Sequence, residues 1–253
     1  MKKIRIVTLL MALCALLPAA PLVLPAQPLF ARELASYSFG GFSIGADWLD
    51  ISDLNTSLSA NGYETFKDPA TNWGFESYYA LNGRFLFGGE FQYFRDKTDN
   101  AAYEQKLDGY WGFLNFGYSL IGKSPKGFHL YPLVGLGASR MGLRLTERDT
   151  LNFSDIVADP KRESNLKKWD FLAQTALGLD YAFGSKWNDD TGGGGFMLGV
   201  RAGYQYSLTD SKWKMDGLDV FGDPEARMSG FFIRVVLGGW VFGSPDDDDE
   251  GYE

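Results

Sequence analysis

Five charged residues lie on the small, polar faces of segments in which bulky and small side chains alternate: Glu76, Glu90, Asp180, Arg201 and Arg234. Strict alternation is typical of β-strands, and all five share the face opposite to the apolar one. Carboxylates and guanidinium groups in a confined interior can form buried ion pairs, and a pair of facing glutamates can also work as a catalytic acid and base. We expect an ionic cluster of Glu76, Glu90, Arg201 and Arg234, with Asp180 beside Arg201, that fills the interior.

Chemistry that needs cysteine or histidine is scarce, because the sequence has one residue of each, Cys14 and His129. These cannot supply an ordinary Cys/His metal site, and no loop carries the dense oxygen ligands of a calcium site. The glycines of Gly135-Leu136-Gly137 do not continue into a dinucleotide-binding motif. We therefore expect no metal, no cofactor and no enzymatic activity. A net charge of −8 without a basic patch also argues against nucleic-acid binding.

The segment Phe196–Leu208 shows the alternation most clearly. Its bulky face carries Phe196, Leu198, Val200, Ala202, Tyr204, Tyr206 and Leu208, and its other face carries Met197, Gly199, Arg201, Gly203, Gln205 and Ser207. A soluble sheet turns its apolar face inward and its charged face to water, whereas a membrane barrel does the reverse. The small polar face suits a crowded interior. This segment therefore predicts a membrane-spanning strand with its apolar side chains toward lipid.

The N-terminus has the features of a secretory signal peptide. A basic start, Met1-Lys2-Lys3-Ile4-Arg5, precedes an apolar run at 6–17 and a stretch rich in proline and alanine. An uncleaved anchor helix is the alternative, but prolines interrupt the stretch and would break such a helix. We expect a signal peptide at 1–31, a barrel at 32–243 and an acidic, disordered tail at 244–253, where six carboxylates lie between Asp246 and Glu253.

Eight segments alternate in this way and are the predicted strands: Tyr37–Ile51, Trp73–Leu81, Phe85–Arg95, Leu107–Ile121, Phe128–Leu145, Lys168–Phe183, Phe196–Leu208 and Arg227–Phe242. The connections are long after the first, third, fifth and seventh strands and shorter after the others. Transmembrane barrels show this asymmetry, with long loops outside and short turns on the periplasmic side. The predicted fold is all-β, an eight-stranded antiparallel up-and-down transmembrane β-barrel, located in the cell outer membrane.

One hairpin is specific enough to predict its register. Asn82-Gly83-Arg84 joins the second and third strands, and Asn-Gly between alternating runs is a strong hairpin signal. With the turn centred on Gly83, Leu81 faces Phe85 and Glu76 faces Glu90, both glutamates pointing inward. Two facing carboxylates repel each other unless one is protonated or cations lie nearby. This repulsion is the reason for expecting the inward arginines beside them.

The remaining segments give local expectations. Ser52–Gly62 has the pattern of a short helix closed by a glycine, but we favour a self-packed loop. Pro132 lacks an amide donor and should lie near a rim or a bulge. Gly238-Gly239 is expected to carry a bulge that returns Trp240 and Phe242 to the lipid face. Aromatic residues near strand ends should form the two interfacial girdles: Trp48, Trp73, Tyr93, Trp169, Phe183 and Trp240.

With these features in place, the chain resembles the small outer-membrane β-barrel family, the OmpA-like and OmpW-like eight-stranded proteins. The resemblance covers roughly Tyr37 to Phe242 and rests on the signal peptide, the eight alternating strands, the glycines of Leu133-Val134-Gly135-Leu136-Gly137 and the ending Trp240-Val241-Phe242. It implies outer-membrane lipid and lipopolysaccharide as surroundings and recognition by the barrel-assembly machinery. We expect a monomer.

Three functions remain open for such a barrel. The first is a structural barrel with a filled lumen whose long loops bind a ligand at the cell surface. The second is a narrow channel for small solutes. The third is a lipid-modifying enzyme, because some outer-membrane lipases and deacylases use a histidine with a serine, and His129 would be that histidine. It follows a short turn on the expected periplasmic side, far from the outer leaflet where such enzymes work, so we expect a structural or solvated role for it.

Overall fold

The computed structural model describes residues 36–122, 126–148, 157, 163–184 and 193–242. The predicted signal peptide and the acidic tail beyond 242 lie outside these residues. Within them, no helix has the length and apolar character needed to span a membrane.

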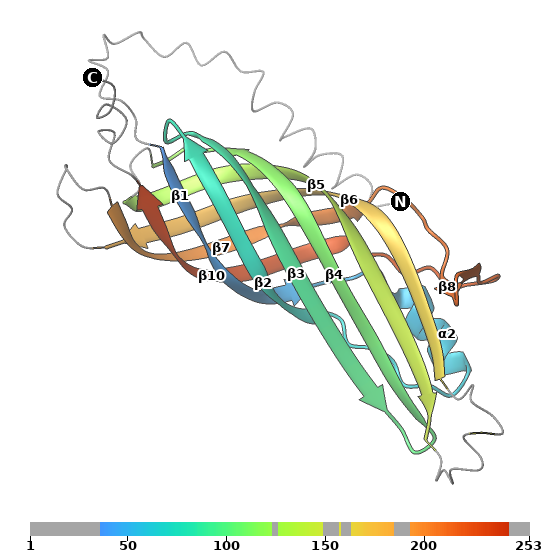
Figure 1. Cartoon of the computed structure of the whole chain (residues 1–253). Helices are drawn as coiled ribbons and strands as arrows, with labels where there is room; N and C mark the ends of the chain where they lie inside the picture. The colour runs from blue at the N-terminus through green and yellow to red at the C-terminus, as the bar shows by residue number, and fades with distance from the viewer. Residues whose placement is uncertain (1–35, 123–125, 149–156, 158–162, 185–192, 243–253) are drawn as a thin grey trace, which may run out of the picture.

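Eight long strands pair in sequence and close on themselves (Figure 1). They are β1 (Tyr37–Asp47), β2 (Ala70–Leu81), β3 (Phe85–Asp99), β4 (Tyr103–Tyr118), β5 (Gly127–Glu147), β6 (Glu163–Phe183), β7 (Gly193–Ser207) and β10 (Gly230–Phe242). All pairings are antiparallel. The first strand, β1, pairs with the last, β10, and this pairing closes the barrel. The predicted fold class, a closed eight-stranded up-and-down barrel, is confirmed.

The two faces of each strand have opposite environments, as the alternation predicts. On β7 the outward Phe196 and Leu198 are 71% and 46% exposed, whereas the inward Arg201 is 1% exposed. The same inversion runs around the wall, with large apolar side chains outside and polar ones within. A continuous apolar outer surface of this kind requires lipid around it. The chain is therefore an integral membrane barrel of the outer-membrane type, in agreement with the predicted location.

The hairpin between β2 and β3 has the predicted register. Leu81 pairs with Phe85 and Glu76 pairs with Glu90. Asn82 and Gly83 take positive φ values of 52° and 62°, which the tight turn requires and which asparagine and glycine tolerate best.

Pro132 lies at a bulge, also as expected. The ladder between β4 and β5 pairs Gly117 with Leu133, but the next bridge pairs Ile121 with Leu130. Residues 118–120 of one chain segment thus oppose only 131–132 of the other. The missing amide donor of Pro132 falls where the ladder is already interrupted, so no regular hydrogen bond is lost.

The segment after β1 is a helix, α2 (Ser52–Ala60), so the preference for a loop is wrong. No side chain caps its first turn, but Leu54 and Leu58 are buried against the barrel mouth. Gly62, with φ of 77°, follows its C-terminal end. Tertiary burial of two leucines stabilises a helix that is weak by its local sequence.

The bulge expected at Gly238-Gly239 is absent. β10 pairs without interruption with β1 on one side and with β7 on the other. A Cβ atom at Gly238 would lie 1.9 Å from the carbonyl oxygen of Gly40, so the glycine permits close approach of β1 rather than a bulge. Trp240 therefore keeps its inward position, is 4% exposed and stacks on Phe242. Its predicted place in the girdle was wrong.

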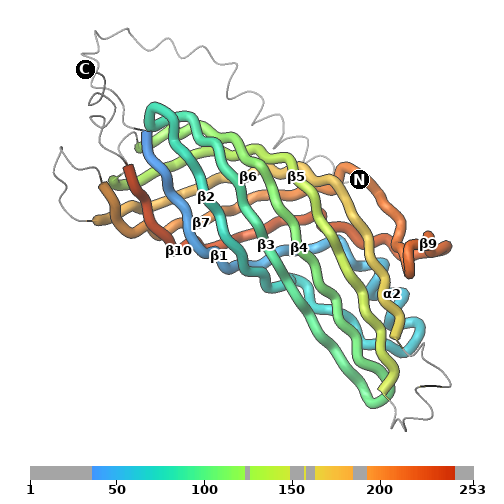
Figure 2. The backbone as a smooth tube through the Cα atoms, viewed as in Figure 1, coloured from blue at the N-terminus to red at the C-terminus, as the bar shows by residue number. Residues whose placement is uncertain are grey.

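The long connection after β7 contains a small hairpin that the sequence reading did not anticipate. It consists of β8 (Lys214–Met215) and β9 (Leu218–Asp219), joined at Asp216 and Gly217, which both have positive φ. β8 pairs with the outer end of β6 through Leu166 and Met215. Figure 2 shows β9 and α2 at the same end of the barrel, opposite to the β2–β3 turn.

The lumen contains two apolar clusters with a polar layer between them. The loop-end cluster joins α2, the strands and the β7–β10 connection through Leu49, Ile51, Leu54, Leu58, Phe66, Ala70, Phe94, Leu107, Trp111, Phe113, Met141, Leu143, Leu172, Trp213, Ala226 and Met228. The turn-end cluster contains Tyr37, Phe39, Tyr78, Ala80, Leu86, Tyr131, Leu133, Ala182, Met197, Val236 and Trp240. An eight-stranded barrel is narrow enough for side chains to fill it in this manner.

Candidate functional site

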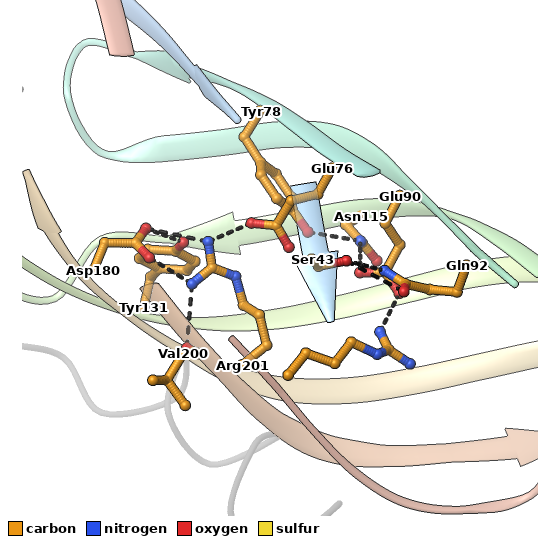
Figure 3. Close-up of polar contacts among 11 residues, drawn as sticks. Ser43, Glu76, Tyr78, Glu90, Gln92, Asn115, Tyr131, Asp180, Val200 and Arg201 are labelled. Carbon is orange, nitrogen blue, oxygen red and sulfur yellow. Dashed lines mark hydrogen bonds and ion pairs between the residues drawn. The ribbon is translucent and has the colours of Figure 1, made fainter. Parts of the chain in front are cut away.

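The candidate site is the polar layer of the lumen, to which all five predicted residues belong. Glu76, Glu90, Asp180, Arg201 and Arg234 come from five different strands and point inward. Each is between 1% and 8% exposed. Figure 3 shows contacts of Glu76, Glu90, Asp180 and Arg201. The structure brings the five together as two ion-pair groups, each built around one arginine.

The first group is centred on Arg201 of β7, which pairs with carboxylates from β2 and β6. Its Nη1 lies 2.5 Å from Asp180 Oδ1, and its Nη2 is paired with Glu76 Oε1. The hydroxyl of Tyr131 donates to Asp180 Oδ2 at 2.5 Å. The guanidinium carbon of Arg201 also lies 5.2 Å from the centre of the Tyr131 ring. Ion pairing and cation–π contact together hold the guanidinium group in place.

The second group is centred on Arg234, nearer the loop end. Its Nη1 lies 2.9 Å from Glu90 Oε1, and its Nη2 lies 3.2 Å from Asp47 Oδ1. The ring of Phe232 packs 4.0 Å from the guanidinium carbon. Asp47, which in turn accepts from the Asn72 amide, was not among the predicted residues. Its inward position at the end of β1 follows from the same alternation, so the signal was present in the sequence.

Neutral side chains extend the second group from Glu90. Glu76 and Glu90 are direct cross-strand partners, and the amide of Asn115 donates to Glu90 Oε2 at 3.3 Å and to the hydroxyl of Tyr78 at 3.0 Å. Gln174 donates to Asn115 Oδ1 at 2.7 Å. Four carboxylates face two guanidinium groups, so these neutral donors offset part of the surplus negative charge. Together the two groups and their neutral partners form a lumen network with side chains from all eight strands of the wall, β1 to β7 and β10.

This geometry suits cross-linking of the wall better than catalysis. A carboxylate pair that works as acid and base must meet a substrate, but the Glu76 and Glu90 side chains are 1% and 3% exposed. One oxygen of each carboxylate already pairs with an arginine, Glu76 Oε1 with Arg201 and Glu90 Oε1 with Arg234. Removing one partner of a buried ion pair typically costs about 3–5 kcal/mol, so the network is a strong constraint on the strands once it has formed.

His129 lies on the turn-end side of the Arg201 group. It is 5% exposed, and its Nδ1 lies 3.2 Å from the hydroxyl oxygen of Tyr37. Its cross-strand partner is Asp180. A cavity of about 10 Å3 adjoins His129, Tyr37 and Phe39, which is space for no more than one water molecule. The histidine is thus packed into the turn end, away from the loops.

No metal site is found among the residues that the structure describes, since no group of three or more histidine, cysteine, aspartate or glutamate side chains is arranged to hold an ion.

A second polar cluster, which the sequence reading missed, ties the β7–β10 connection over the loop end. Lys168 is 3% exposed, and its Nζ donates to the carbonyl oxygen of Ala226 at 2.7 Å and lies 3.4 Å from Asp170 Oδ2. Asp170 Oδ1 accepts from the backbone amide of Ser211 at 3.0 Å. The inward positions of Lys168 and Asp170 were evident from alternation, but their partners lie some forty to sixty residues away in an irregular segment.

The same connection carries an ion pair at its surface. Arg227 Nη2 lies 2.9 Å from Asp210 Oδ2, and this hydrogen bond lowers the pKa of the Asp210 carboxyl group and raises the pKa of Arg227. Trp213, 1% exposed, packs beneath this segment in the loop-end cluster. The connection therefore forms a fixed cover over the lumen.

The girdle residues other than Trp240 lie on the outer face as predicted. Trp48 and Trp73 are each 43% exposed, Trp169 is 55% exposed and Phe183 is 45% exposed. Tyr93 contacts Trp73 at a ring distance of 5.4 Å. Aromatic side chains at these heights are typical of the interface between lipid and water.

Comparison with known proteins gives likeness at the level of fold. No family model and no curated protein matches the chain. Among solved structures, Ail, the attachment invasion locus protein of Yersinia pestis, is 13% identical with a TM-score of 0.39, the match covering 82% of this chain and 97% of that one. The N-terminal β-barrel domain of Pseudomonas aeruginosa OprF has the same identity and score, with 82% and 96% covered.

A third similar structure is the outer membrane protein OprG from Pseudomonas aeruginosa, 16% identical with a TM-score of 0.36, covering 83% of this chain and 93% of that one. The eight-stranded barrel fold of this chain is shown by its own closed strand pairing.

Proposed function

We propose that this protein is an integral outer-membrane barrel with a closed, side-chain-filled lumen, which serves as a structural element and binds ligands at the cell surface through its long loops. The observation that carries the proposal is the pair of ion-pair groups around Arg201 and Arg234, held between two apolar clusters. A conducting pore needs a hydrated path, whereas these side chains form ion pairs with one another across the lumen.

Single-channel recording in a planar bilayer tests the closed lumen. The unmutated protein should show no steady, large conductance, and Arg201→Ala combined with Arg234→Ala should produce a leak or a destabilised barrel. Arg144→Ala serves as a matched control, because Arg144 is half exposed and pairs with Glu163 at the surface. Steady, large conductance from the unmutated protein would establish the alternative function, a narrow channel for small solutes.

The enzymatic alternative is less well supported. A histidine–serine enzyme that modifies lipid at the outer leaflet would need His129 near the loops, but this residue is buried at the turn end beside Tyr37. We propose that the chain has no catalytic activity. Incubation of the purified barrel with lipopolysaccharide, followed by mass analysis of released fatty acids, checks this. Release that His129→Asn abolishes would refute the proposal.

The surface that would bind a ligand is the loop end. α2, the β8–β9 hairpin and the cover anchored by Lys168 and Asp170 give this end a defined shape. Defined loops on a rigid barrel are where binding residues are commonly found. Insertion is proposed to depend on the barrel-assembly machinery, through the strand that ends in Trp240-Val241-Phe242, and the barrel is proposed to act as a monomer.

A further inference from the structure

A row of interfacial side chains crosses four neighbouring strands on the outer wall. Cross-strand pairing places Tyr93 beside Tyr110, Tyr110 beside Arg140, and Arg140 beside Trp169. Arg140 is the one cation in this row. Its guanidinium carbon lies 5.6 Å from the Tyr110 ring centre and 5.8 Å from that of Trp169. Tyrosine and tryptophan mark the height of the lipid head groups, so Arg140 lies at that height.

Further positive charge lies directly above Arg140, toward the loop end. In the next outward row Arg95 pairs with Asp108, Asp108 with Gly142, and Gly142 with Lys167. Gly142 has no side chain, and the Asp108 carboxylate lies over it, with both oxygens 3.4 Å from the place that a Cβ atom would take. Lys167 and Arg140 are diagonal neighbours on either side of this position. Within the described part of the chain, no carboxylate forms an ion pair with Arg95, Arg140 or Lys167, and Asp108 is the one acid in these two rows. The patch has a surplus of two positive charges.

An apolar depression begins immediately below Arg140. Its volume is about 800 Å3, and its walls include Phe91, Leu114, Leu136 and Phe171. The surface is hollow here because Gly112 and Ala138, the next outward residues below Tyr110 and Arg140, have little or no side chain. A methylene group fills about as much space as a water molecule, roughly 30 Å3, so the depression has room for a long acyl chain.

We propose that this part of the wall is a binding site for a phosphorylated glycolipid of the outer leaflet, with a phosphate group held by Arg140, Lys167 and Arg95 and one acyl chain lying in the depression. The two features are contiguous and match the two halves of such a lipid. The guanidinium and ammonium groups recognise phosphate oxygens, and the aromatic walls pack against hydrocarbon. The bound lipid is the lipid A portion of lipopolysaccharide, because the site is on the half of the barrel that carries the long loops.

This inference rests on the proposed orientation in the outer membrane, but not on the closed lumen. The site is on the outer wall, whereas the side chains of Glu76 and Glu90 behind it point into the lumen. A barrel that conducts ions could still bind the lipid, and a closed one could fail to do so. Conductance and lipid binding therefore test separate claims.

The experiment measures binding of bisphosphorylated lipid A to the purified full-length barrel in detergent by native mass spectrometry. Dephosphorylated lipid A and phosphatidylglycerol are the comparison lipids. Arg140→Gln removes the central cation, and Ala138→Phe fills the depression without altering the charge. Arg144→Gln, on the same strand but already paired with Glu163, and Ala202→Phe, on the exposed face of the opposite wall, are the matched controls. Heat-modifiable migration confirms that each variant is folded.

We expect Arg140→Gln and Ala138→Phe each to weaken lipid A binding about tenfold or more, the scale of one lost charge-assisted contact. The two controls should bind as the unmutated protein does, and both comparison lipids should bind more weakly than lipid A. Equal binding by Arg140→Gln and the unmutated protein would overturn the phosphate site. Equal binding of phosphatidylglycerol would overturn the assignment to a glycolipid, and an equal loss in Ala202→Phe would refute the depression as the acyl-chain site.

Discussion

Replacement of Arg201 by methionine tests the lumen network most directly. The side chains of Arg201, Glu76 and Asp180 are each at most 2% exposed, so the variant leaves two carboxylates without their cation in a site that water does not reach. Breaking a buried ion pair in this way costs about 3–5 kcal/mol. Since two pairs and the contact with the Tyr131 ring are lost together, we expect a loss toward the upper end of that range.

The measurement is urea-induced unfolding of the barrel in phospholipid vesicles, followed by tryptophan fluorescence. A second variant separates charge from packing: Arg201→Met combined with Glu76→Gln and Asp180→Asn removes all three charges at similar volume. It should recover most of the lost stability, because no uncompensated charge stays buried. Arg144→Met breaks an exposed pair with Glu163 and should cost less than about 1 kcal/mol.

The reasoning would be refuted by a loss below about 1 kcal/mol in Arg201→Met, a value ordinary for exposed pairs. It would also fail if the triple variant were as unstable as the single one, since the cost would then come from packing and not from stranded charge.

Two more predictions follow from the wall and the cover. Gly238→Val should impair closure between β1 and β10, because its Cβ would lie 1.9 Å from the Gly40 carbonyl oxygen, and the folded band in heat-modifiable electrophoresis should be lost; Gly89→Ala, whose Cβ would lie 3.3 Å from the Phe113 carbonyl oxygen, should be far milder, and equal behaviour of the two would contradict the argument. The Asp210–Arg227 pair should make the cover sensitive to acid. The folded-state pKa of Asp210 is lowered by Arg227, so its contribution is present above the ordinary carboxyl pKa of 3.8 and is lost as the pH falls through the lower folded value. Hydrogen exchange in residues 209–227 should rise in that acid range for the unmutated protein, and a variant Asp210→Asn that kept the same rise would disprove the assignment.

Much of the wall is determined locally. Residues of a strand alternate with a period of two, so the inward positions of Glu76, Asp180 and Arg201 follow from the sequence around each one. The pairing of Glu76 with Glu90 is equally local, because a turn at Asn82-Gly83 leaves little freedom in register. Fold class and the facing of each strand were therefore predictable from the sequence.

The tertiary structure decided which inward groups meet. Alternation gives Arg234 a direction but not a partner, and its contact with Asp47 joins the last strand to the first, which depends on barrel closure and strand stagger. Closure also kept Trp240 inside, since pairing on both sides of β10 left no room for a bulge. The α2 helix is a third case, because Leu54 and Leu58 become helical by packing against residues from distant strands. Periodicity is a property of neighbours in sequence, whereas closure, stagger and burial depend on the whole chain.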